Sequence, residues 1–131
     1  MSYPDTPIGA EEELRRLSFD LDDARMKLRD ARNAEVAREM AYRKARRAAT
    51  LSAECPKVRR GHGSEPSVTV AERDAWVEQA CEAEEFDLAI ATATRQAAGD
   101  LLRTLQAQAS IQQTVSRSVM DSFRMSSGQG R

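Results

Sequence analysis

The sequence predicts an all-α protein: a long antiparallel two-helix hairpin, or coiled coil, which dimerisation would complete as a four-helix bundle. Its 131 residues include 21 alanines but few aromatic side chains, a composition typical of long helices. Apolar residues recur at helical spacing on both sides of one break, at 55–69. The charges also form blocks of alternating sign that an antiparallel hairpin would bring together.

Residues 1–9 contain two prolines and a glycine and are predicted to be a flexible leader. The hairpin is expected over 10–123. Its first helix is expected over about 10–54, because this range contains neither glycine nor proline. The glutamates at 11–13 stand in the first turn, where the helix dipole favours anions. At 1.5 Å per residue such a helix is about 65 Å long.

A coiled-coil seam runs along the first predicted helix, meaning positions at alternating spacings of three and four residues that face a partner helix. It begins with Leu14, Leu17, Leu21, Ala24, Leu28 and Ala31. Glu35 and Arg38 stand at the next two positions, so we expect the seam to break there. It would resume three residues out of step, a stammer. The resumed seam is predicted on Ala34, Ala37, Ala41, Ala45, Ala48 and Ser52.

A bend is expected over 55–69, where two prolines and two glycines oppose helix formation. Thr69 and Glu72 have the spacing of a capping box and predict the start of a second helix. This helix is expected over about 70–123, with Gly99 as its weak point. Residues 124–131 are predicted to be a flexible tail.

Folding about the bend predicts which segments meet. Leu17 would lie opposite Leu105, Leu28 opposite Arg95 and Ala34 opposite Ala89, given equal rise in both helices. The block 38–60 has a net charge of +6 and would face the acidic block 72–87. Such complementarity helps to fix orientation and register. The two cysteines, Cys55 and Cys81, would lie at different heights along the hairpin.

Two features predict self-association. The segment 114–123 would overhang the start of the first helix, and several large apolar residues do not fit a single seam. A second copy could cover them by closing a four-helix bundle; the alternative is that the overhang is a disordered end. The residues predicted to bind a partner, either a second copy or an unidentified protein, are Leu21, Met26, Met40, Ile90, Val115, Val119 and Phe123.

The sequence offers little for catalysis. One histidine, His62, would need a nucleophile that the helices hold at a distance, and no phosphate-binding glycine loop follows a strand. Cys55, His62 and Cys81 lack the close spacing of zinc ligands. We therefore expect no enzyme, no cofactor and no metal. No signal-peptide core or long apolar run is present, which favours a cytoplasmic protein without a membrane partner.

Nucleic acid is the alternative partner, because positive charge is concentrated near the bend and could contact phosphates. Pairing with the acidic block is the favoured use of these bases, since no aromatic residues interleave with them for base stacking. Trp76 is expected to pack against the same end of the hairpin. The candidate nucleic-acid residues are Arg43, Lys44, Arg46, Arg47, Lys57, Arg59 and Arg60.

The segments 52–57 and 69–77, which leave the first helix and open the second, resemble those of small helical-hairpin proteins encoded by phages of actinobacteria. The resemblance extends over about 10–123 and rests on pattern. It implies a phage accessory protein in the host cytoplasm, associated with DNA replication or recombination, and no defined activity. The WXG-type helical hairpins differ, because their turn contains Trp-x-Gly and this one reads Arg-Gly-His-Gly at 60–63.

The function expected from the sequence is therefore that of an oligomeric coiled-coil module that binds proteins and has no enzymatic activity. Direct binding of nucleic acid through the basic end (43–60) is the first alternative. A structural spacer in virion assembly is the second.

Overall fold

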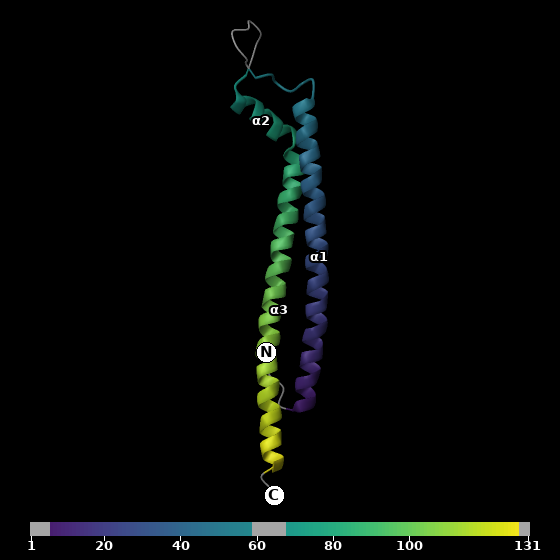
Figure 1. Ribbon diagram of the computed structural model, residues 1–131, viewed down its shortest axis with the longest axis vertical. Coiled ribbons are helices and arrows are strands. Elements are labelled where there is room, and N and C mark those ends of the chain that lie inside the picture. The colour runs from purple at the N-terminus through teal and green to yellow at the C-terminus, as the bar shows by residue number, and fades with distance from the viewer. Residues whose placement is uncertain (1–5, 59–67, 129–131) are drawn as a thin grey trace. The chain divides into compact units, whose positions relative to one another are not determined.

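The computed structural model describes residues 6–58 and 68–128. In this part of the chain, every regular element longer than a single bridge is a helix. Helix α1 spans Pro7–Leu51, α2 spans Val70–Ala80 and α3 spans Glu82–Gly128 (Figure 1). The two long helices pack together. A single isolated bridge joins Val58 and Val68, and the described residues form no strand. The all-α class predicted from the sequence is confirmed.

The chain divides into two compact units. Unit 1 combines Met1–Asp30 with Gln96–Arg131, and unit 2 is Ala31–Arg95. Each unit contains part of α1 and part of α3, and unit 2 also contains α2. No helix of the described residues is long and apolar enough to cross a membrane.

The first helix begins earlier than predicted. The Thr6 hydroxyl oxygen accepts a hydrogen bond from the Gly9 amide at 3.1 Å, and the Thr6 carbonyl accepts one from the Ala10 amide at 2.9 Å. Pro7 suits the first helical position, because its φ is already fixed and the helix does not need its missing N–H. Residues 6–9 therefore form the start of α1 rather than a leader, and residues 1–5 lie outside the described residues.

The other helix ends also differ from the predicted ones. Helix α1 ends at Leu51, where the Ser52 amide reaches back to the Ala49 carbonyl at 3.2 Å. Helix α3 continues to Gly128, so most of the predicted tail is helical. The segment 59–67 of the predicted bend lies outside the described residues.

The second predicted helix is divided at Cys81. Its amide is shared between the carbonyls of Val77 and Glu78, at 3.1 and 3.2 Å, and its φ and ψ of −107° and 14° are not helical. The Thr69 hydroxyl caps α2 by accepting from the Glu72 amide at 3.1 Å, as the sequence predicts. Within unit 2, Figure 1 shows α2 leaning away from the line that α3 follows.

The seam of unit 1 follows the predicted spacing along α1. Ala10, Leu17, Ala24 and Leu28 are buried. On α3, Gln112 and Ser116 are 3% and 6% exposed, and the Gln112 amide nitrogen and the Ser116 hydroxyl have no hydrogen-bond partner. The buried seam of unit 1 therefore includes two polar side chains from α3.

In unit 2 the predicted stammer does not occur. The original spacing continues from the buried Ala31 through the half-buried Glu35 to the half-buried Tyr42 and the buried Ala49, with the exposed Arg38 between them. The residues of the predicted second seam are instead exposed, except for one that belongs to both the original spacing and the resumed one. The exposed residues are Ala34, Ala37, Ala41, Ala48 and Ser52, and the shared one is Ala45.

Glu35 fits the seam because α3 places an opposite charge beside it, whereas Arg38 is exposed at the edge of the seam and lies near an opposite charge of α3. Arg95 Nε donates to Glu35 Oε2 at 2.9 Å, and Arg38 Nη1 lies 3.6 Å from Asp87 Oδ2. A charged pair can occupy a seam position when each member supplies the other's partner. The apparent break in the apolar pattern is therefore an ion-paired part of an unbroken seam.

The predicted pairing of the helices is shifted. Leu28 lies next to Gly99, whose added Cβ would be 3.9 Å from Leu28 Cδ1, whereas the sequence placed Arg95 there. Arg95 instead pairs with Glu35. We attribute the shift to α2. This helix is inclined to the line of α3, so each of its residues rises less along the axis of α1 than a residue of a continuous helix would. The residues of α3 that face α1 therefore come later in the sequence than predicted.

A small apolar cluster in unit 2 joins α1, α2 and Cys81, the residue between α2 and α3. Ala49, Val77 and Cys81 form its buried centre, and Trp76 packs against it, as expected from the sequence. Cys55 also packs against this cluster, so the two free thiols share one site rather than lying at different heights. Burial and the nearby carboxylate of Glu84 raise the pKa of the Cys81 thiol.

Candidate interaction surfaces

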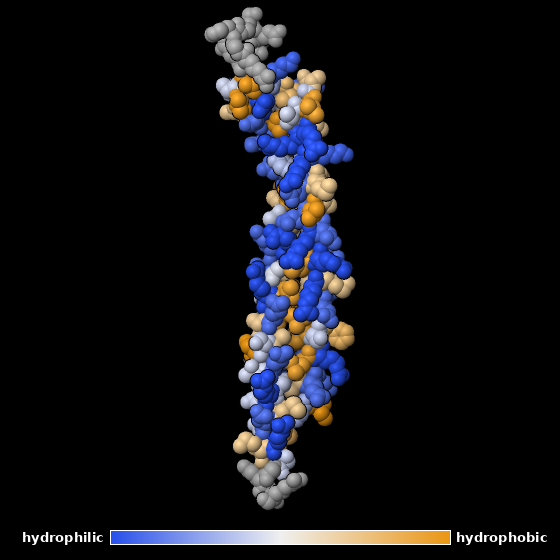
Figure 2. Space-filling view, viewed as in Figure 1, coloured by the Kyte–Doolittle hydropathy of each residue, from blue (hydrophilic) through white to orange (hydrophobic). Residues whose placement is uncertain are grey.

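The distribution of apolar side chains is unusual, because small ones lie inside and large ones outside. Among the described residues, four of the eight buried apolar ones are alanines, and the larger ones are Leu17, Leu28, Val77 and Cys81. Figure 2 shows hydrophobic side chains on the surface at several places among hydrophilic ones. The exposed large residues are Ile8, Phe19, Met26, Val36, Met40, Leu51, Val70, Phe86, Ile90, Leu101, Ile111, Met120, Phe123 and Met125.

The residues predicted to bind a partner are divided between the two units. Unit 1 contains Leu21, Met26, Val115, Val119 and Phe123, and unit 2 contains Met40 and Ile90. Four of the seven are exposed: Met26, Met40, Ile90 and Phe123. The other three are half-buried, with Leu21 at a seam position of α1.

Sequence reasoning missed several exposed apolar residues, among them Phe19 and Leu101. Phe19 is 71% exposed and lies on the side of α1 opposite the seam, two residues from the buried Leu17. The sequence pattern could have identified them. If the alternating spacings of three and four residues are continued along each helix without a break, both residues fall outside the seam.

Ile90 lines a groove between α1 and α3 in unit 2. The groove has a volume of about 230 Å³ and is also lined by Ala31, Ala34, Arg38, Asp87, Ala91 and Thr94. The Arg38–Asp87 ion pair bounds it. Its lining of methyl groups beside a single ion pair suits an apolar side chain better than a polar ligand.

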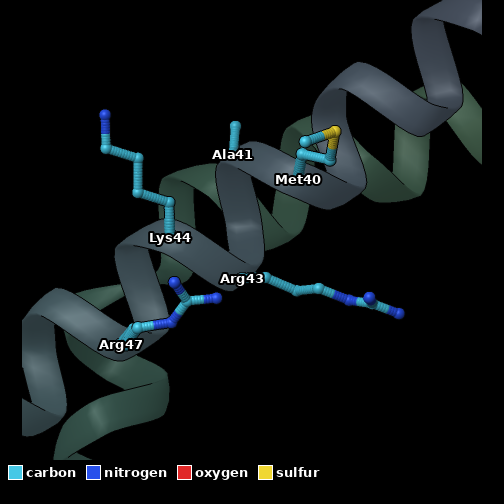
Figure 3. A pocket seen from close by; sticks show the side chains of 5 residues that line it. All are labelled: Met40, Ala41, Arg43, Lys44 and Arg47. Carbon is cyan, nitrogen blue, oxygen red and sulfur yellow. The ribbon is translucent and has the colours of Figure 1, made fainter.

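The basic segment of α1 forms a separate surface. Met40, Ala41, Arg43, Lys44 and Arg47, all of α1, line a hollow of about 490 Å³ (Figure 3). Arg43 pairs with Glu39 of the same helix at 2.7 Å. Among the described residues, Lys44 and Arg47 form no ion pair within 4 Å.

The predicted neutralisation of the basic block by the acidic one is therefore partial. One ion pair, between Arg38 and Asp87, links the described residues of the two blocks. Arg46 donates to the Tyr42 hydroxyl at 3.3 Å, and this bond, reinforced by Glu78 and Asp74, raises the pKa of Arg46. The outward charges of the basic surface remain available to a partner.

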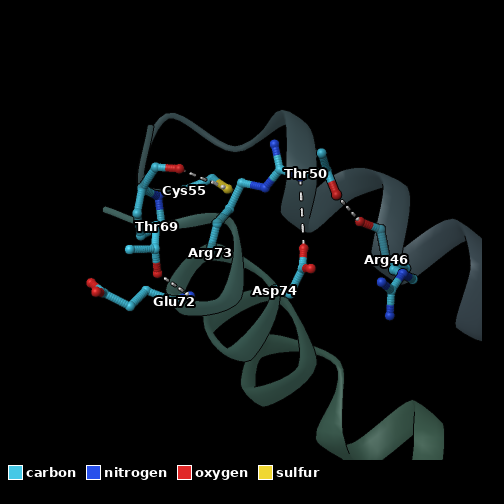
Figure 4. Close-up of polar contacts among 8 residues, drawn as sticks. Arg46, Thr50, Cys55, Thr69, Glu72, Arg73 and Asp74 are labelled. Carbon is cyan, nitrogen blue, oxygen red and sulfur yellow. Dashed lines mark hydrogen bonds and ion pairs between the residues drawn. The ribbon is translucent and has the colours of Figure 1, made fainter. Parts of the chain in front are cut away.

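The end of unit 2 near the bend carries a third hollow, of about 610 Å³. Residues 50–53 and 55–58 line it together with Arg73. Local contacts shape this end (Figure 4): the Thr50 hydroxyl donates to the Arg46 carbonyl at 2.9 Å, and Arg73 lies 3.7 Å from Asp74. Lys57 lies here. Arg59, Arg60 and His62, also considered from the sequence, lie outside the described residues.

Comparison with protein-family models, curated proteins and solved structures found no match. Within 6–58 and 68–128, no group of three His, Cys, Asp or Glu side chains could hold a metal ion. The features that can act on a partner are the outward apolar side chains and the basic face of α1.

The Glu35–Arg95 pair gives the fold a defined response to acid. The hydrogen bond from Arg95 holds the pKa of Glu35 below its ordinary value, although partial burial opposes the shift. A lowered pKa in the folded state stabilises the fold above the ordinary value of about 4.3. This stabilisation is lost as the pH falls through the lowered pKa.

We expect Glu35→Gln to be less stable than the wild type at neutral pH, and the difference to shrink below about pH 4.3. Urea unfolding at several pH values measures it. Arg95→Gln should remove the same pH-dependent increment, because it removes the other member of the pair. A difference between Glu35→Gln and the wild type that stays constant between neutral pH and pH 3 would contradict this role.

Proposed function

We propose that the chain is a non-enzymatic, oligomeric coiled-coil module that acts by binding protein surfaces. The observation that supports this most directly is the inverted apolar distribution. Phe19 and Phe86, both aromatic, are 71% and 65% exposed, whereas alanines occupy much of the buried seam. A bundle of more helices would bury large apolar side chains of this kind.

The cellular setting of the proposal comes from the resemblance to helical-hairpin proteins of actinobacteriophages. We propose a phage accessory protein in the cytoplasm of the host, with a role in DNA replication or recombination. In this role the chain would bring partner proteins together rather than carry out a chemical step.

Light scattering across a wide range of concentrations tests the proposal. We expect a mass above the 14.5 kDa of one chain, rising with concentration, because association is governed by mass action. A helical species that keeps the mass of one chain at every concentration would overturn the oligomeric module.

Nucleic-acid binding is a second candidate, favoured by one observation. Lys44 and Arg47 project from α1 beside the apolar hollow (Figure 3) and form no ion pair with another described residue. Cations that are not neutralised by neighbours can release counterions from a phosphate backbone.

If this candidate is correct, replacing both Lys44 and Arg47 by alanine should weaken binding to labelled DNA. It should also reduce the slope of log affinity against log salt by roughly 1.4–1.8 units, about 0.7–0.9 for each phosphate contact. Fluorescence polarisation at low and physiological salt measures both. The matched control replaces Lys27 and Arg29, which removes the same charge elsewhere on α1. Equal effects of the two variants, or no binding by the wild type, would exclude a site here.

A further inference from the structure

Helix α3 carries a second stripe at coiled-coil spacing within unit 1. From Ala97 to Met125, the nine positions at alternating spacings of four and three residues contain no charged residue. Leu101 and Ile111 on this stripe are 44% and 53% exposed. With 3.6 residues per turn, its centre lies about 110° around α3 from the seam that faces α1. Helix α3 therefore has two faces suited to packing against helices.

The segment of α1 in the same unit has no comparable face. Twelve of the twenty residues at 11–30 are charged, against five of the 33 residues at 96–128. Phe19 and Met26 of α1 are exposed, but charged side chains surround them in the sequence. Because a charged residue costs free energy when it is buried without a partner, α3 offers the better docking face in unit 1.

We propose that this stripe is the dimerisation surface of the chain and that α3 of a second copy packs on it in the antiparallel direction. Leu101 lies opposite Met125 of the second copy, and Ile111 lies opposite Val115 of the second copy. This inference rests on the proposed function and specifies its self-association. Two helix-packing faces about 110° apart allow α3 to contact α1 and α3 of the second copy at the same time.

Charge complementarity identifies a second copy as the occupant. In this register Asp100 lies beside Arg124 of the second copy, and Arg103 beside Asp121 of the second copy. Twofold symmetry forms each pair twice. In the single chain Arg103 and Asp100 already pair at 2.6 Å on the surface. Asp121 and Arg124 form no ion pair with another described residue within 4 Å, so the dimer supplies partners for them.

Other arrangements of two copies fit less well. In a parallel pair, Asp100 and Arg103 would each face the same residue of the second copy, and like charges repel. An antiparallel pair shifted by seven residues would place Leu101 opposite Ser118 and Ile111 opposite Gln108, which loses the apolar contacts. The proposed register pairs the large apolar residues of the stripe with one another, places Thr104 opposite Ser122 and Gln108 opposite Ser118, and matches the charges.

Disulfide cross-linking tests the register directly. Leu101 and Met125 are replaced by cysteine in one chain, with Cys55→Ser to leave Cys81, 1% exposed, as the remaining thiol. After mild oxidation with diamide, we expect most chains to run as covalent dimers on a non-reducing gel. Leu101→Cys alone and Met125→Cys alone should give at most a small fraction, because each then faces a residue without a thiol.

The other outcomes overturn the inference in distinct ways. Efficient cross-linking of Leu101→Cys alone would indicate a parallel pair, and stronger cross-linking of Leu101→Cys with Ile111→Cys would indicate another antiparallel register. Dimers in light scattering with no cross-link in any variant would mean that another surface associates, and the proposed function would stand. A mass of one chain at every concentration would overturn both.

A charge exchange at the surface serves as a second test that does not disturb the apolar stripe. Asp121→Lys should weaken dimerisation roughly three- to tenfold, since symmetry breaks two exposed pairs at once. Adding Arg103→Glu to the same chain should restore most of the affinity, because it re-forms both pairs with reversed sign. Sedimentation equilibrium measures the dissociation constants. Failure of the second substitution to rescue the first would contradict the proposed register.

Discussion

Replacing Val77 by aspartate is expected to destabilise unit 2 by about 3 kcal/mol or more, the cost of burying a charge without a dedicated partner. Val77 is 3% exposed and lies at the centre of the cluster that joins α2 to α1. Trp76 is the sole tryptophan and packs against the same cluster. Urea unfolding followed by tryptophan fluorescence therefore measures the loss of stability within unit 2. We expect the variant to have a lower midpoint of unfolding and a red-shifted emission.

Val70→Asp is the matched control for this substitution. Val70 is the first residue of α2 and is 53% exposed, and an acidic residue in the first turn is favoured by the helix dipole. The free energy of unfolding of this variant should stay within about 0.5 kcal/mol of that of the wild type. Equal losses in the two variants would show that α2 does not pack against α1 through Val77.

Leu28→Ala is expected to destabilise unit 1 by about 2–5 kcal/mol, the usual cost of removing a buried leucine side chain. Leu28 is 9% exposed and lies against Gly99 of α3. Glycine has no side chain that could move into the space left by the leucine, which favours the upper part of this range. Circular dichroism during thermal and urea unfolding measures the change.

Met26→Ala, two residues away on the same helix, is the control for this second substitution. Met26 is 55% exposed, so its truncation should change the free energy of unfolding by less than about 0.5 kcal/mol. A loss at Met26 as large as that at Leu28 would mean that α1 presents a different face to α3.

The sequence predicted the helical class and the first half of the seam because apolar periodicity carries that information. The seam around Leu17 and Leu28 is made of apolar residues, so a count of apolar positions finds it. The same count failed at Glu35 and Arg38, since it treats a charged residue as an interruption. Keeping one spacing on both helices would have placed Arg95 at a seam position too and revealed a residue of opposite charge.

The division between α2 and α3 could not be predicted by the usual signals. Neither glycine nor proline stands near Cys81, and the break consists of one non-helical residue stabilised by burial in the cluster. Its position follows from tertiary packing, which local propensity does not describe. These errors in the seam also changed which residues were predicted to bind a partner, because the position of the seam determines which face of each helix is exposed. Met26 and Ile90 were identified correctly as exposed, whereas Leu101 was missed.

The unbroken seam determines which side chains face outward, and thiol labelling tests it most directly. Neighbouring alanines near the end of α1 are replaced one at a time in a Cys55→Ser chain. Ala48 is exposed and Ala49 is 9% exposed. We expect Ala48→Cys to react at least about tenfold faster than Ala49→Cys, because labelling a buried thiol requires local opening. Fast labelling at position 49 with protection at position 48 would restore the stammer and contradict the seam described for α1.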